Sequence, residues 1–378
     1  MYLAAALAAL PGAAGMAADA PARQSAGTVG EALAAALKAR DSDAFMRYVD
    51  SSGVVRIVLK DLGLGESEAA ALREQLPNSV RKNIDTSMRA LDQGKASVRF
   101  MRDGRQDGRA YALVRIDMGE GGVDYIKYFL SPRYLVEDWY VYTSAALFTT
   151  QVRFNLAAML KSDSLLSAVF GVNRVSRADL KPFTDLRQRI AADDYPGAYR
   201  ALESFAESYR KSRQWALMRV AYGQRSGDDN YRAALRHLAA SFGSDGDLQL
   251  MLIDHYFFEK QFERSLAALA ALEQAVGGED ASTSSLRGNL LTEMKRYPDA
   301  AQACRRAIAA EPDFKHGYWC LVTVGTSSND GKLAVEGLTA YEKAFEVSFN
   351  PDKVAAQDVY KNVARTPEFA AWAKSRKR

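Results

Sequence analysis

The chain has 378 residues, of which 48% are hydrophobic and 25% are charged, a composition typical of globular proteins and long enough for two domains. Its formal net charge of +4 is small for this length and comes from interspersed Lys and Arg. A charge of this size argues against nucleic acid or an anionic membrane as the binding partner.

The first 20 residues are mostly small and apolar, and the richest stretch runs from Leu3 to Leu10. This run is too short to cross a bilayer, which needs about 20 apolar residues, but it matches the hydrophobic part of a secretory signal cleaved after Ala17 or Ala20. No Lys or Arg precedes the run, so an upstream start codon or a plain alanine-rich leader is the alternative. We expect residues 1–20 to be a leader and the protein to be periplasmic or otherwise exported.

Residues 27–150 combine a helical pattern with a strand pattern. Apolar residues recur at helical spacing between Thr28 and Leu91, where Pro77 is expected to kink or split the last helix. The spacing then changes to the two-residue alternation of strands, and the segments are separated by the predicted turns Asp103-Gly104, Asp107-Gly108 and 119–122. The four predicted strands are 97–102, 110–118, 123–130 and 134–142. Helices followed by such a meander predict an α+β domain with the helices on one face of a curved antiparallel sheet.

The order of these elements, and the aromatic last strand Val136 to Tyr142, resemble the nuclear-transport-factor-two-like superfamily of cone-shaped domains. That superfamily includes isomerases and dehydratases as well as binding and dimerisation modules, and its enzymes place an acid or a base at the bottom of the cone. The resemblance implies a pocket in which carboxylates and phenols of the strands transfer protons. The candidates are Asp117, Asp124, Asp138, Tyr125 and Tyr128. Solvated carboxylates and packed tyrosines are the alternative.

After a helical linker predicted over residues 151–177, the chain repeats a pair formed by an aromatic residue and a small residue three positions later. The pairs are Tyr195/Ala198, Tyr231/Ala234, Phe262/Ser265 and Tyr297/Ala300, which follow one another after 36, 31 and 35 residues. A period of this length cannot come from the turn of a single helix, so it predicts supersecondary units that stack on one another. We expect residues 178–378 to form an all-α helical solenoid.

The unit from Asp280 to Phe314 resembles a tetratricopeptide repeat, with Gly288 at the position where that family needs a small residue. In that family the first helices of the hairpins line a concave groove that binds another protein or peptide. Matching the family register places seven residues on the groove: Arg219, Asp254, Phe257, Asn289, Thr292, Trp319 and Thr323. The family's clamp for a C-terminal carboxylate is not reproduced, because only Asn289 holds one of its places. A purely structural groove is the alternative.

The only cysteines are Cys304 and Cys320, on adjacent predicted helices. They form either a pair of buried thiols or a disulfide, which would stabilise the fold by about 3 kcal/mol in an oxidising compartment. The histidines His237, His255 and His316 have no carboxylate or thiol at metal-ligand spacing. Neither a phosphate-binding glycine loop nor a Gly-x-Ser-x-Gly motif occurs. We therefore expect no metal, no cofactor and no catalytic residue.

Together these patterns favour a non-enzymatic interaction or scaffold protein of the bacterial cell envelope, which binds another protein through its helical repeats. No integral membrane segment is expected in the mature chain. A second hypothesis assigns binding of a small apolar ligand, or acid–base catalysis, to the pocket of the N-terminal domain. A third is a structural protein that forms a homodimer through the open face of its sheet.

Overall fold

The structure is a computed structural model that describes residues 25–60, 62, 64–119, 122–160, 170 and 180–376. The chain divides into two compact units, with the boundary between Leu248 and Gln249. The predicted leader, residues 1–20, lies outside the described residues, as does most of the linker predicted over 151–177. Among the described residues, no helix has the length and apolar character needed to cross a membrane.

The first unit begins with four helices: α1 (Ala26–Ala39), α2 (Ser42–Met46), α3 (Ser51–Leu59) and α4 (Glu66–Gln93). Ser25, Asp41 and Asp50 cap the first three, since each side chain accepts a hydrogen bond from a backbone N–H of the first turn. Helix α4 continues through Pro77, so the predicted split of this helix does not occur. Leu76 and Val80 are both buried beside the proline, and this packing outweighs the lost backbone hydrogen bond.

A five-stranded antiparallel sheet follows, in the order β1-β2-β3-β4-β5. Its strands are β1 (Ser97–Gln106), β2 (Arg109–Asp117), β3 (Val123–Leu130), β4 (Val136–Val141) and β5 (Ala146–Leu147). The four predicted strands are present, and the short β5 is additional. Of the two Asp-Gly pairs near β1, only Asp107 and Gly108 form a turn, with φ values of 49° and 77° that suit a tight hairpin. Gly104 instead lies within β1 and pairs with Tyr111 of β2.

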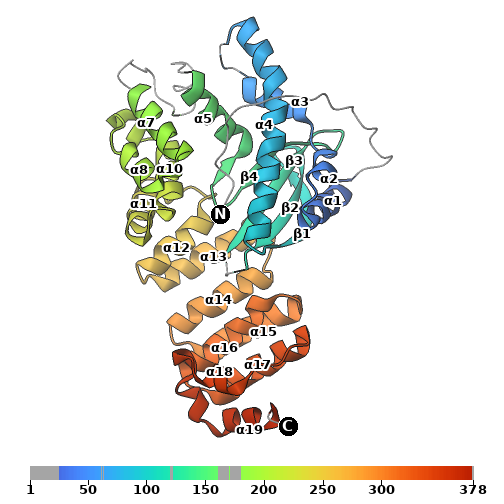
Figure 1. The fold of residues 1–378 in the computed structure, drawn as a ribbon, viewed down its shortest axis with the longest axis vertical. Helices are drawn as coiled ribbons and strands as arrows, with labels where there is room; N and C mark the ends of the chain where they lie inside the picture. Colours follow the sequence, from blue (N-terminus) through green and yellow to red (C-terminus); the bar gives the residue numbers. More distant parts are fainter. Residues whose placement is uncertain are drawn as a thin grey trace. The chain divides into compact units, whose positions relative to one another are not determined.

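The helices α1 to α4 cover one face of this sheet (Figure 1). Leu33 and Phe45 from the helices share a buried core with Val114, Ile126 and Val141 from the strands. The apolar residues at alternate positions of β2, Ala110, Val114 and Ile116, therefore line the core, as expected for the period of a strand. The opposite face of β2 is buried as well.

The described residues that follow β5 in the first unit form the helices α5 (Phe148–Leu160), α7 (Leu180–Ala191), α8 (Tyr195–Leu202), α9 (Glu207–Arg210), α10 (Arg213–Gln224) and α11 (Asp228–Phe242). Two polar contacts tie these helices to the sheet at Asp247. Tyr140 of β4 donates to its carboxylate over 3.1 Å, and Arg213 of α10 donates to it over 2.7 Å. The first helical hairpins thus share a compact unit with the sheet.

The second unit contains three antiparallel helical hairpins, α12/α13, α14/α15 and α16/α17, which follow one another along the chain (Figure 1). Their helices are α12 (Gln249–Phe258), α13 (Phe262–Val276), α14 (Ala281–Glu293), α15 (Tyr297–Ala310), α16 (Lys315–Ser328) and α17 (Gly331–Phe345). The second unit is thus built from the stacked helical hairpins that the aromatic–small pairs at Phe262 and Tyr297 predict. The C-terminal elements are α18 (Pro351–Ala355), η2 (Asp358–Tyr360), η3 (Val363–Arg365) and α19 (Pro367–Arg376). Phe369 and Trp372 of α19 share a buried cluster with Leu338 of α17, so the C-terminal elements cover the last apolar face of the stack.

Glycines let the helices of the second unit approach closely. A Cβ added at Gly288 would lie 2.4 Å from the sulfur of Cys320 and 2.7 Å from that of Cys304. A Cβ added at Gly325 would lie 2.3 Å from the backbone nitrogen of Ala334, where no side-chain movement can make room. The requirement for a small residue at Gly288 is therefore confirmed.

Candidate protein-binding face

The first helices of the three hairpins, α12, α14 and α16, each expose a residue at the same position of the repeat. These residues are Asp254, Asn289 and Thr323, which are 35 and 34 residues apart, and all three are exposed. The residue before each of them, Ile253, Gly288 and Val322 respectively, is buried. In each first helix, one residue thus packs inside the unit and the residue that follows it faces the solvent. We call Asp254, Asn289 and Thr323 the exposed stripe.

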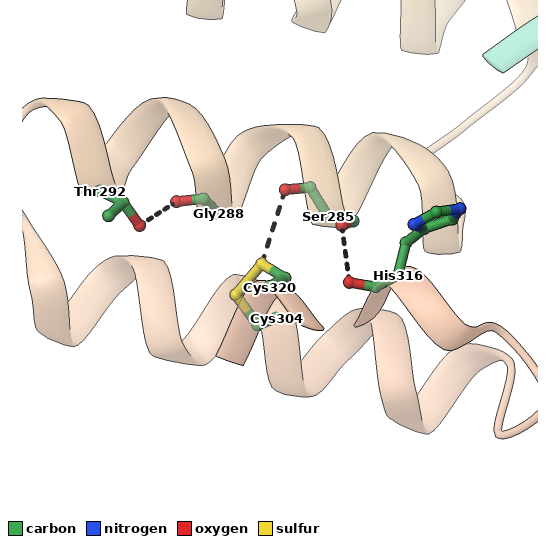
Figure 2. The surroundings of a disulfide bond; sticks show 6 residues. All are labelled: Ser285, Gly288, Thr292, Cys304, His316 and Cys320. Carbon is green, nitrogen blue, oxygen red and sulfur yellow. Dashed lines mark hydrogen bonds between the residues drawn. A yellow bond between two sulfur atoms is a disulfide. The ribbon is translucent and has the colours of Figure 1, made fainter. Parts of the chain in front are cut away.

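A disulfide bond between two repeats lies next to Asn289, the middle residue of the exposed stripe. Cys304 of α15 and Cys320 of α16 form a disulfide with a Cα–Cα distance of 5.5 Å, which resolves the alternatives that the sequence left open. Figure 2 shows this disulfide beside Gly288, the residue that precedes Asn289, and the Ser285 hydroxyl donating to the His316 carbonyl over 3.3 Å. Helix α14 is therefore held against α15 and α16 directly beneath the exposed Asn289.

Two of the residues predicted to line the groove, Phe257 and Trp319, are aromatic and partly exposed. Phe257 of α12 is 39% exposed and touches the ring of Phe262, with 5.9 Å between centroids. Trp319 of α16 is half-buried, and its ring lies 5.1 Å from that of Tyr341 and 5.8 Å from that of Phe349. Both side chains combine internal packing with a solvent-facing part, which is typical of aromatic residues at binding surfaces.

Thr292 does not belong to the surface. Its side chain is buried, and its hydroxyl donates to the Gly288 carbonyl of the preceding helical turn over 2.8 Å. This internal bond is a common role of threonine in helices. The prediction that Thr292 lines a groove is therefore wrong.

Arg219 lies in α10 of the first unit, whereas the other six predicted residues belong to the second unit. Its guanidinium carbon lies 5.3 Å from the ring centroids of both Tyr199 and Trp215, and its Nε is 3.1 Å from a carboxylate oxygen of Glu203. The side chain is only 17% exposed. These contacts hold the guanidinium against side chains of its own unit, and they do not support the predicted role of Arg219 in binding a partner.

Two carboxylates proposed for a catalytic pocket are instead bound by the protein itself. Asp124 accepts hydrogen bonds from the backbone N–H of Tyr125 and from both the N–H and the hydroxyl of Thr143, over 2.8, 3.0 and 2.7 Å. Asp138 repeats the arrangement with the N–H of Trp139 and with the N–H and hydroxyl of Thr149, over 2.9, 3.1 and 2.7 Å. We call these the two Asp–Thr clamps. Each ties a strand to the segment that follows β4.

The remaining candidates of that pocket are also buried. Asp117 is paired with Arg115 over 2.8 Å, and both side chains are at most 5% exposed. Tyr125 and Tyr128 are buried, and burial followed by the nearby Asp124 raises the pKa of Tyr128. Burial likewise raises the pKa of Asp124 to about 6 against the opposing effect of its hydrogen bonds, and it raises the pKa of Asp138. These groups have structural partners. Among the described residues, no group of three or more His, Cys, Asp or Glu side chains could hold a metal ion.

Comparisons with known proteins give little further information. No protein-family model and no curated protein matches the chain. Among solved structures, the chain is similar to the crystal structure of PilW, a widely conserved type IV pilus biogenesis factor, with 14% identity and a TM-score of 0.35. The match covers 53% of this chain and 93% of the PilW chain. A similarity of this level does not bear on function, and the resemblance of residues 27–150 to the nuclear-transport-factor-two-like superfamily stays a prediction.

Proposed function

We propose that the protein is a non-enzymatic interaction or scaffold protein of the bacterial cell envelope, and that it binds a partner protein through the first helices of its second unit. The exposed stripe carries this proposal. Asp254, Asn289 and Thr323 occupy one position in three successive repeats and are exposed, although the preceding residue is buried each time. Repeat proteins use such extended rows of equivalent positions as binding surfaces.

The chemistry of the face favours an extended peptide segment as its ligand. Asn289 offers both a donor and an acceptor, and Thr323 offers a hydroxyl, so together they can pair with the backbone of an extended chain. Phe257 and Trp319 supply aromatic surface at the edges, and aromatic side chains dominate the binding energy of many interfaces. Asp254 and the exposed Glu293 make the face acidic, which favours a neutral or basic segment.

The packing beneath the face supports a preformed site. The disulfide and Gly288 fix three helices against one another, so that little conformational entropy is lost when a ligand binds. Disulfides persist in oxidising compartments such as the periplasm, and this agrees with the predicted leader. The bonded carboxylates of Asp124 and Asp138 support a structural rather than a catalytic role for the sheet.

Site-specific photo-crosslinking tests the proposal. A photoreactive amino acid is introduced at Asn289 or Thr323, and the control positions are Gln302 and Ala309, which are exposed on the second helix α15. In cells that produce the protein natively, a discrete protein adduct is expected from the first two positions and not from the controls. Adducts of equal yield at all four positions, or at none, would contradict the proposal.

A further inference from the structure

The first unit contains a cavity of about 120 Å³ that is distinct from the exposed stripe. It lies between α4, α10 and the segment that runs from the end of β4 through β5 into α5. Its apolar walls include Val80 of α4, Phe148 of α5, and Leu217 and Met218 of α10. No Asp, Glu, Lys or Arg is among the described residues that line it.

One polar atom in this cavity lacks a partner. The side-chain oxygen Oδ1 of Asn83 is buried, and no described group donates a hydrogen bond to it. Three other polar side chains of the lining, those of Gln151, Ser144 and Ser79, are bonded within the protein. The amide of Gln151 donates to the hydroxyl of Ser144 over 2.9 Å, and the hydroxyl of Ser79 contacts the Gln75 carbonyl over 3.4 Å. A buried acceptor without a donor is unusual in folded proteins, and a bound molecule that carries a donor would satisfy it.

Size and charge narrow the chemical class of that molecule. An apolar cavity of about 150 Å³ accommodates benzene, so the present volume suits a single ring or a short branched chain. An ionised ligand is disfavoured because the lining offers no charge to compensate its desolvation. A ligand without any donor would leave the Asn83 oxygen unsatisfied.

We propose that this cavity binds a neutral small molecule of about one aromatic ring that carries a single hydroxyl or N–H donor. Its apolar body packs against Phe148, Leu217 and Met218, and its donor bonds to the oxygen of Asn83. This site is independent of the partner-binding face, so either proposal can fail without the other.

Titration of the full chain with three probe molecules, followed by NMR, tests this site. Phenol can donate a hydrogen bond, anisole can only accept one, and toluene can do neither. In the unsubstituted protein phenol is expected to bind, and Asn83→Leu is expected to lower its affinity relative to that of toluene about three- to ten-fold. Asn78→Leu is the matched control, because Asn78 is exposed on the same helix and outside the cavity lining. Asn78→Leu should leave the ratio of the phenol and toluene affinities unchanged.

A second variant separates loss of binding from loss of folding. Ala221 of α10 lines the cavity, so Ala221→Leu is expected to fill it and abolish binding of all three probes without lowering the unfolding temperature. Three results would overturn the proposal. The first is that the unsubstituted protein binds none of the probes, which would identify a cavity filled by water only. The second is that Asn83→Leu leaves the ratio of the phenol and toluene affinities unchanged, and the third is that it selectively weakens the binding of anisole.

Discussion

The sheet of the first unit and the repeats of the second unit bury different kinds of residue. The sheet buries an arginine and several carboxylates, including Arg115, Asp117, Asp124 and Asp138. The repeats bury glycine and alanine at their helix contacts and enclose a disulfide. The buried charged groups of the sheet therefore depend on their hydrogen-bond partners, whereas the helix contacts at Gly288 and Gly325 depend on the absence of side-chain volume. Substitutions should accordingly damage the two regions in opposite ways, by removing polar atoms in one and by adding carbon atoms in the other.

The largest effect is expected at Gly325. Gly325→Leu should lower the free energy of unfolding by about 3 kcal/mol or more, because its side chain meets the backbone of Ala334. Gly27→Ala in α1 is the control. An added Cβ there comes no closer than 3.8 Å to another group, so this variant should be as stable as the original or more stable by up to about 1 kcal/mol. Denaturant titration measures the free energy of unfolding of both variants. A loss below about 1 kcal/mol for Gly325→Leu would contradict the claim that the helix contacts of the second unit require small residues.

The disulfide should act on the second unit alone. Replacing Cys304 and Cys320 together by alanine is expected to destabilise that unit by about 3 kcal/mol, since the bridge closes a loop with a sequence separation of 16. Hydrogen exchange resolves the two units and should show unchanged protection in the sheet. A reducing agent should reproduce the effect in the original protein and have none in the double variant. If protection fell equally in both units, the bridge would not be a local constraint.

The Asp–Thr clamps test the polar half of the comparison. Thr149→Val keeps the side-chain volume but removes the hydroxyl that donates to Asp138 over 2.7 Å. The expected loss of unfolding free energy is about 1.5 to 3 kcal/mol, because a buried carboxylate loses one of its donors. Thr339→Val, at an exposed position of α17, should change the stability by less than about 0.5 kcal/mol. Equal effects of the two substitutions would show that the clamp contributes nothing to stability.

The smallest predicted effect is the pH dependence that comes from Asp124. Burial raises its pKa in the folded protein to about 6, above the ordinary value of 3.8, so the folded state takes up the proton first as the pH falls. Asp124 therefore adds stability as the pH falls through 6, by about 1 kcal/mol between about pH 6.5 and pH 5.0. Asp124→Asn should abolish this contribution. The measurement is the difference in unfolding free energy between the two proteins at both pH values, and a difference independent of pH would contradict the assignment.

The fold was largely predictable because two periods dominate the sequence. The alternation of apolar and polar residues predicted the strands, and the aromatic–small pairs predicted the hairpins, including the tight packing at Gly288. The turn at Asp103 and Gly104 was predicted wrongly, since two Asp-Gly pairs look alike in sequence. Only their partner strand decides between them, and Gly104 pairs with Tyr111. The extent of the compact units could not be predicted either, because the ion pairs of Arg213 with Asp245 and Asp247 depend on how loops converge in space.

The candidate face was predicted only in part. The repeat register placed Asp254, Asn289 and Thr323 on a surface, and all three are exposed, but it could not show that Thr292 is buried. The Asp–Thr clamps had no local signal. The threonines lie 19 and 11 residues after Asp124 and Asp138, beyond the strands that carry the carboxylates.

The affinity of the partner crosslinked at Asn289 tests the central claim most directly. It should be measured for the original protein, for Asn289→Arg combined with Thr323→Arg, and for Gln302→Arg combined with Ala309→Arg. Both double variants add the same charge at exposed helical positions, but only the first alters the exposed stripe. The first should bind the partner about ten-fold or more weakly and the second with unchanged affinity. Equal affinity of all three proteins would show that the partner binds elsewhere.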